Sequence, residues 1–194
     1  DMLVPEEKKT MIDAAKAEVA RIDEMYQNGL ITEGERYNKV IDEWTTTSEA
    51  VAEVMLKQMA DNALRNRVPL NWRGSVQTQA VDGREMFDLK MNGTAIFVDV
   101  ARLYALANGI AETHTRRRFE AIAPHLKAGP QESEGWSGAF EFLQSLRLQA
   151  QLRSTTQPNL VDPATLNDID RRVLKECIRA MRRLQQRVEL DFQR

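Results

Sequence analysis

Cysteine and histidine are scarce in this chain of 194 residues, and their scarcity excludes several kinds of chemistry. The single cysteine, Cys177, has no internal partner for a disulfide. It lies in the apolar-periodic segment RRVLKECIRAMRRLQ, a setting typical of a buried small hydrophobe rather than of a nucleophile. The two histidines, His114 and His125, stand in no metal-ligand spacing with each other or with Cys177. A histidine-based metal site is therefore not expected.

Long apolar runs are also missing. No stretch of eighteen apolar residues is present, and the first residues, DMLVPEEKK, show neither the basic nor the apolar region of a signal peptide. We therefore expect no membrane partner and a cytoplasmic location. What the chain does have is 42% hydrophobic and 29% charged residues, a composition that can bury the core of an ordinary domain.

Charge is unevenly distributed along the chain. Residues 1–60 carry 13 acidic and 7 basic side chains, net −6, whereas the remainder carries 16 acidic and 20 basic side chains, net +4. The two parts therefore differ in character. The positive excess of the second part is spread among acidic residues and lacks interleaved aromatic residues, a pattern typical of solvated helix faces rather than of a nucleic-acid groove. We expect no nucleic-acid partner.

The first part has the pattern of a helical hairpin. Apolar side chains recur at steps of three and four over residues 5–28, as in a coiled-coil seam, the stripe of side chains that faces the other helix. Pro5 suits the first turn of this helix, and Gly29 can adopt the left-handed conformation that ends it. Thr32 and Glu35 then form a capping box that begins a second helix. The predicted seam comprises Ile12, Ala15, Val19, Ile22 and Tyr26 in the first helix and Tyr37, Val40, Ile41, Trp44, Thr47, Val51 and Val54 in the second.

The rest of the chain predicts a helical bundle. The second helix of the hairpin should continue to about Asn66, because no glycine or proline interrupts it before Pro69. The segment SVQTQAVDGREMFDLKM alternates and centres on Asp82-Gly83, a dipeptide that favours a two-residue β-turn. The predicted fold is mainly α: a long antiparallel helical hairpin of coiled-coil type that continues into a helical bundle with one small β-hairpin.

Start signals and apolar spacing place the helices of the bundle and its core. Thr113 or Thr115 is expected to cap one helix, Ser133 to precede the next, and Asn167 or Asp168 to open the last. The predicted core comprises Phe97, Val100, Leu103, Leu106, Phe119, Ile122, Phe140, Leu143, Leu146, Leu174, Ile178, Met181 and Leu184.

The string GLITEGERYNKVIDEW at the tip of the hairpin resembles the rim helices of the bacterial RNA polymerase β′ subunit. The resemblance covers about residues 1–55, from DMLVPEEKK to SEAVAEVM, and departs at Glu43, where an apolar residue is expected. It implies a noncatalytic docking surface for secondary-channel transcription factors of the Gre and DksA type. It also implies that Glu35 meets the factor. No cofactor is expected for the chain itself, apart from a weak contact of ppGpp with Asn38, Lys39 and Asp42 when a partner factor is present.

Residues from about 56 to 194 resemble a different family, the nucleotidyltransferase substrate-binding domain of bacterial proteins. These proteins also carry CBS or cyclic-nucleotide-binding-like modules and a catalytic domain. The strings that carry the resemblance are NALRNRVPLNWRG, DLKMNGTAIFVDVARLYALANGI, FEFLQSLRLQAQ and LVDPATLNDIDRRVLKECIRAMRRLQ. The resemblance implies that the metal-binding carboxylates of nucleotidyl transfer belong to a separate catalytic domain, the expected partner of the bundle. We therefore expect the chain alone not to be an enzyme, since it shows no closely placed carboxylates of the kind that two-metal phosphoryl transfer requires.

Several polar residues of the bundle are candidates for substrate contacts, although each also has a structural interpretation. Asp88 and Lys90 follow the predicted β-hairpin, and Asp99 and Arg102 are an i,i+3 pair. Asn159 and Asp162 are typical turn and cap residues. The full set of candidates is Asp88, Lys90, Asp99, Arg102, Arg147, Asn159 and Asp162.

The two resemblances are to unrelated proteins and meet near residue 55, inside a predicted continuous helix. The chain is thus interpreted as a chimera of two domains, residues 1–55 and 56–194. The alternative is a natural accessory domain of a signalling nucleotidyltransferase whose N-terminal hairpin mimics the polymerase. Neither the reason for the junction nor the substrate of the bundle follows from the sequence.

Overall fold

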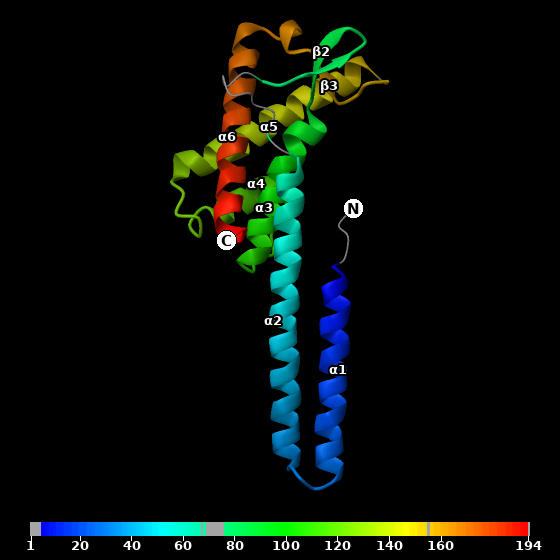
Figure 1. Cartoon of the computed structure of the whole chain (residues 1–194). Helices are drawn as coiled ribbons and strands as arrows, with labels where there is room; N and C mark the ends of the chain where they lie inside the picture. The colour runs from blue at the N-terminus through cyan, green and yellow to red at the C-terminus, as the bar shows by residue number, and fades with distance from the viewer. Residues whose placement is uncertain (1–4, 67, 69–75, 155, 194) are drawn as a thin grey trace. The chain divides into compact units, whose positions relative to one another are not determined.

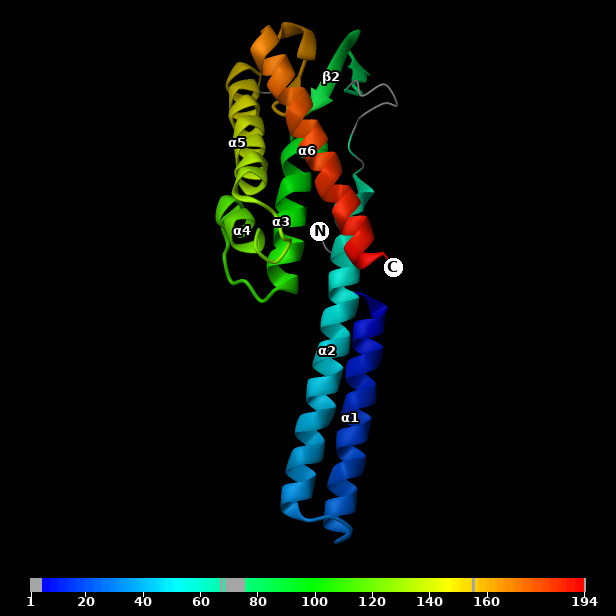
Figure 2. The same ribbon diagram turned by 90° about the vertical axis from the view of Figure 1, so that its left-hand side faces the viewer.

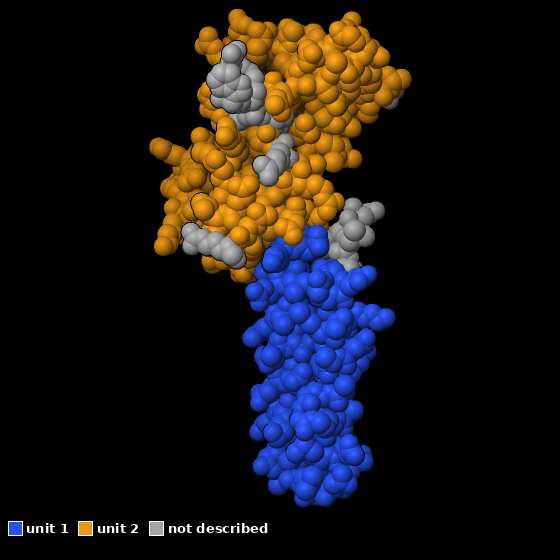
Figure 3. Space-filling model, in the orientation of Figure 1, with its two compact units in different colours: residues 1–59 blue, residues 60–194 orange. Residues whose placement is uncertain are grey.

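The computed structural model describes residues 5–66, 68, 76–154 and 156–193. The chain forms two compact units, residues 1–59 and 60–194, which Figure 3 distinguishes by colour. The described part is mainly α-helical, as the sequence predicts, and its few strands form one small sheet. No described helix is long and apolar enough to cross a membrane.

The first unit is an antiparallel helical hairpin. Figures 1 and 2 both show α1 (Glu6–Gln27) lying beside α2 (Glu33–Arg65). Helix α1 ends in a Schellman motif: Gly29 has a φ of +69°, and the Leu30 N–H donates to the Met25 carbonyl at 2.9 Å. Helix α2 is one unbroken helix to Arg65, which confirms the predicted continuous helix across residue 55.

The seam of α2 is the predicted one in part. Val40, Thr47, Val51 and Val54 are half-buried, as predicted. Tyr37 is 64% exposed and Ile41 48% exposed, so the expectation that they hold the hairpin together is wrong; Trp44, at 38%, is only partly covered. Arg36 and Glu43, one position before Tyr37 and Trp44, are half-buried instead.

Ion pairing explains why Arg36 takes the place of Tyr37 in the seam. Arg36 Nη1 lies 2.6 Å from Asp23 Oδ1 on α1, and its guanidinium carbon lies 5.3 Å from the centroid of the Tyr26 ring. The aliphatic part of an arginine can cover apolar surface while its head group stays paired. A prediction based on apolar side chains places the charged Arg36 on the solvent-facing side of the helix and therefore selects Tyr37 for the seam.

The second unit contains a three-stranded antiparallel sheet of order β1-β2-β3. Its strands are β1 (Gln79–Val81), β2 (Arg84–Asp88) and β3 (Leu160–Val161). The β1–β2 turn has φ values of +50° at Asp82 and +74° at Gly83, so the predicted β-hairpin is confirmed. The sequence did not predict β3, whose two residues are too few for a periodic signal.

The rest of the described second unit is largely helical. A π-helical turn (Lys90–Thr94) leads into α3 (Ala95–Ala107), and a 3-10 turn (Pro163–Thr165) precedes the last helix. The other helices are α4 (Thr115–Ile122), α5 (Pro130–Arg153) and α6 (Asp168–Phe192), all visible in Figure 2.

The predicted helix caps are right in one case and wrong in two. Asn167 caps α6 by accepting from the Asp170 N–H at 2.9 Å. Helix α4 begins at Thr115, but His114 occupies its cap position without a side-chain bond, so neither predicted threonine caps this helix. Helix α5 begins at Pro130, which suits a first helical position, and Ser133 lies inside it.

The core of the bundle is aromatic at its centre. Phe97 is fully buried and meets Phe119 and Phe140 edge-on, with ring centroids 6.0 and 6.5 Å apart. All the predicted core residues are buried except Leu106, which is 55% exposed. Tyr104, two residues before Leu106 in α3, is buried, and its hydroxyl donates to Asp191 Oδ2 at 2.7 Å.

Candidate functional site

The tip of the hairpin is organised by the predicted capping box. The Thr32 N–H and the Thr32 hydroxyl both donate to Glu35 Oε2, at 2.8 and 2.9 Å, and the Glu35 N–H donates to Thr32 Oγ1 at 3.3 Å. These hydrogen bonds, first that of the Thr32 backbone, lower the pKa of Glu35. Glu35 remains exposed, so its charge faces solvent while its orientation is fixed.

Asn38, Lys39 and Asp42 are all exposed on the first turns of α2. Lys39 and Asp42 line a shallow hollow of about 280 Å³ between the two helices, and Asn38 and Glu35 lie outside it. The structure thus brings two of the four predicted tip residues into one concave surface. The sequence did not predict the contribution of α1 to this hollow, which is made by Glu18, Arg21, Ile22 and Met25.

The charged side chains that line this hollow differ in their ion pairing. Arg21 binds Glu18 through two hydrogen bonds of 2.6 and 2.9 Å, and these bonds lower the pKa of Glu18. Lys39 forms no ion pair within the described residues, although its charge adds to the lowering of the pKa of Glu35. The Lys39 ammonium is therefore the cation at the tip that is available to an external anion.

Four of the candidate residues of the bundle are held in local hydrogen bonds. Asp88 Oδ1 accepts from the Lys90 and Met91 N–H groups at 2.8 Å each and so caps the π-helical turn. Arg147 Nε donates to Asn159 Oδ1 at 2.8 Å, and Asp162 accepts from the Ala164 N–H at 2.8 Å. These contacts match the structural interpretation of each residue.

Asp88 and Asn159 also lie close together. The Leu89 N–H donates to the Asn159 carbonyl at 2.8 Å, and Asp88 pairs with Leu160 in the sheet. Asp99 and Arg102 are on α3, outside this group. Burial raises the pKa of Asp99, and Arg102 opposes that shift. Lys90 is exposed.

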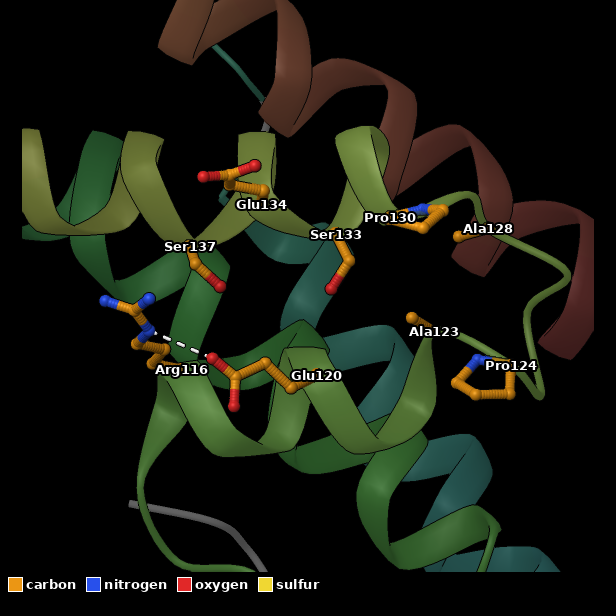
Figure 4. A pocket seen from close by; sticks show the side chains of 9 residues that line it. All are labelled: Arg116, Glu120, Ala123, Pro124, Ala128, Pro130, Ser133, Glu134 and Ser137. Atoms are coloured by element: carbon orange, nitrogen blue, oxygen red, sulfur yellow. Dashed lines mark hydrogen bonds and ion pairs between the residues drawn. The ribbon is translucent and has the colours of Figure 1, made fainter.

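A hollow between α4 and α5 was not predicted from the sequence. It has a volume of about 430 Å³, and Figure 4 shows the Ser133 and Ser137 hydroxyls directed from α5 toward α4. Ser133 and Ser137 are four residues apart and thus on one helix face, but this spacing alone does not indicate a hollow. No group of acidic, histidine or cysteine residues suited to a metal ion occurs among the described residues.

Two comparisons identify relatives of different parts of the chain. Residues 53–192 match the model of the family described as "Putative nucleotidyltransferase substrate binding domain". Over 67 residues, 34% of this chain, the sequence is 48% identical to the β′ subunit of DNA-directed RNA polymerase from Pseudoalteromonas atlantica. It is 50% identical over 66 residues to the β′ subunit from Xanthomonas euvesicatoria.

The chain spans 5% of the length of these curated relatives. No solved structure matches the chain. The comparisons confirm that two kinds of sequence, one similar to polymerase β′ and one similar to a nucleotidyltransferase substrate-binding domain, are joined in one chain.

Proposed function

The chain belongs, over residues 53–192, to the nucleotidyltransferase substrate-binding domain family, and we propose that its N-terminal hairpin adds to this domain a docking surface for secondary-channel transcription factors. The observation that carries the proposal is the exposure of Glu35, Asn38, Lys39 and Asp42 at the start of α2, within the string GERYNKVID. These are the positions that the resemblance to the rim helices of β′ assigns to factor and ppGpp contacts.

The chemistry of the tip suits this role. Glu35 presents an oriented carboxylate to a basic group of a DksA- or Gre-type factor. Lys39, which forms no ion pair with the residues that the structure describes, offers its ammonium to a phosphate, and Asn38 offers an amide that can donate and accept hydrogen bonds. The hollow at Lys39 is open and shallow, so ppGpp needs the factor as the other half of its site.

Removing the charge of Glu35 tests the docking role. The Glu35→Gln variant keeps a side-chain oxygen that can accept from Thr32, so it should fold like the wild type but bind a DksA-type factor from Xanthomonas euvesicatoria several-fold more weakly. Calorimetric titration measures the affinity. Glu49→Gln, an exposed change elsewhere on α2, is the control. Equal affinity of the wild type and Glu35→Gln would contradict the assignment of Glu35 to the factor.

For the bundle we infer an accessory role without catalysis. The family match supports it, because the matched model is that of a substrate-binding domain. When the chain is added to a nucleotidyltransferase catalytic domain of the same family of proteins, the KM of that domain for its substrate should decrease. An unchanged KM would contradict the accessory role.

The chain alone should transfer no nucleotide, because two-metal phosphoryl transfer requires carboxylates that hold both cations. Incubation with ATP and Mg²⁺ or Mn²⁺ should leave ATP intact. Product formation that survives repurification and disappears on mutation of a residue of this chain would overturn the noncatalytic assignment.

A further inference from the structure

The hollow between α4 and α5 has the features of a small ligand site. Its volume of about 430 Å³ lies within the range of ligand pockets in proteins. All its lining residues belong to the second unit, and none of them is among the candidates predicted from the sequence. They are Arg116, Glu120, Ala123, Pro124, Ala128, Pro130, Ser133, Glu134 and Ser137.

Ser137 is the feature that points to a ligand. Its residue is 4% exposed, and its Oγ is buried without a hydrogen-bond partner among the described residues. Ser133, one turn earlier, differs, because its Oγ bonds the Phe119 carbonyl at 3.2 Å. A buried hydroxyl without a partner costs free energy, so an external group that pairs with Ser137 would recover that cost.

The two ends of the hollow differ in polarity. Figure 4 shows Arg116 and Glu120 near Ser137 at one end and Pro124, Pro130 and two alanines at the other. The apolar end can cover a flat hydrocarbon or aromatic group. The hollow therefore favours a molecule with one polar group and one apolar body.

The charge at the polar end disfavours an anionic group. Arg116 already binds Glu120 at 3.0 Å and Glu141 at 2.9 Å, so its positive charge is more than balanced. An added carboxylate would face this negative excess. A neutral group that both accepts and donates hydrogen bonds can accept from Ser137 and donate to the Glu120 carboxylate.

We propose that the α4–α5 hollow binds a small aromatic molecule carrying a neutral amide, with the amide at Ser137 and the ring between Pro124 and Pro130. The inference rests on the proposed substrate-binding role of the bundle and names the chemical class of its ligand. Benzamide is the simplest probe of this class, and benzoate is its anionic counterpart of similar size.

Titration of each probe into ¹⁵N-labelled full chain, followed by chemical shifts, tests the proposal. Benzamide should bind with a dissociation constant on the order of millimolar, as expected of so small a ligand, and should shift the amide signals of residues 133–137. Benzoate should bind at least five-fold more weakly. Absence of benzamide shifts in this segment, or equal affinity for benzoate, would overturn the proposal.

Ser137→Ala is the decisive variant, because it removes only the buried hydroxyl without a partner. It should be at least as stable as the wild type and bind benzamide about five-fold more weakly, the effect of losing one neutral hydrogen bond. Ser145→Ala, an exposed change on the same helix, should bind like the wild type. Unchanged affinity of Ser137→Ala would refute the placement of the amide. These results are independent of the KM measurement with a catalytic domain, so failure of the ligand assignment is distinguishable from failure of the accessory role.

Discussion

Gln185 is a buried amide within the apolar face of α6. It is 7% exposed, and its Nε2 donates to the Ala63 and Asn66 carbonyls at 2.9 and 2.8 Å. Its Oε1 accepts from the Val68 N–H at 3.1 Å. One side chain thus satisfies three backbone groups at the end of α2 and just beyond it, where a helix leaves carbonyls without intrahelical partners.

Replacing Gln185 with leucine should therefore destabilise the bundle. The change keeps the size of the side chain but leaves one N–H and two carbonyls without partners, at a cost of about 1–3 kcal/mol. Urea unfolding followed by circular dichroism measures the loss. Gln186→Leu, an exposed neighbour, should change stability by less than about 0.5 kcal/mol. Equal stability of the two variants would show that the three hydrogen bonds contribute nothing.

Cys177 is a core residue and not a reactive thiol. It is 3% exposed, and burial raises the pKa of its thiol to about 12. At pH 8 the thiol is protonated in the folded chain, so a disulfide reagent should label it orders of magnitude more slowly than in guanidinium-unfolded chain. Fast labelling of the folded chain at pH 8 would contradict this assignment. The measurement is absorbance of the released thiol with and without denaturant.

The capping box makes the stability of the tip of α2 depend on pH. Because its hydrogen bonds to Thr32 lower the pKa of Glu35 in the folded state, their contribution is fully present above the unfolded pKa of a glutamate. It is lost as pH falls through the lowered folded value. The hydrogen-exchange protection of residues 33–37 should therefore weaken on acidification below about pH 4.

Two variants check this linkage. Thr32→Ala should weaken the tip at neutral pH by about 1 kcal/mol, as loss of an N-cap does. Glu35→Gln should flatten the acid dependence of exchange at the tip, whereas Glu33→Gln, an exposed change in the same turn, should preserve it. If Glu35→Gln retains the full acid dependence, another group is responsible for it.

At the scale of elements, the sequence predicted what local chemistry decides. Gly29 ends α1, Thr32 begins α2, and Asp82-Gly83 turns the β-hairpin, each through its own backbone or side chain. The prediction failed where contacts with residues distant in the sequence determine the local structure. Ser133 reads as a cap, yet it lies inside α5 and bonds Phe119 across the bundle.

The same limit applies to the candidate sites. The exposure of Asn38, Lys39 and Asp42 follows from helical spacing, but the meeting of Lys39 and Asp42 with α1 at one hollow depends on how the two helices pack. The α4–α5 hollow depends on how two helices pack, and no single helix sequence specifies that. Periodicity correctly identified Phe97 as core but placed Leu106 there as well, although Leu106 is 55% exposed.

At the scale of the whole molecule, the chain combines two kinds of sequence through one helix. Helix α2 begins within the β′-like string and continues to Arg65, within the part matched by the substrate-binding family. The hairpin and the bundle each have a candidate site built from their own residues, the tip of α2 and the α4–α5 hollow. The proposed function therefore has two separable parts.

The central claim is that the tip of the hairpin is a docking surface that retains its nucleotide contacts. The direct test is calorimetric titration of a DksA-type factor into the wild type and the Asn38→Ala/Lys39→Ala double variant, each with and without ppGpp. Both residues are exposed, and alanine is a better helix former, so the helix content should be unchanged. We predict weak binding to the wild type that ppGpp tightens, and no effect of ppGpp on the double variant. Equal affinities in all four titrations would contradict the claim.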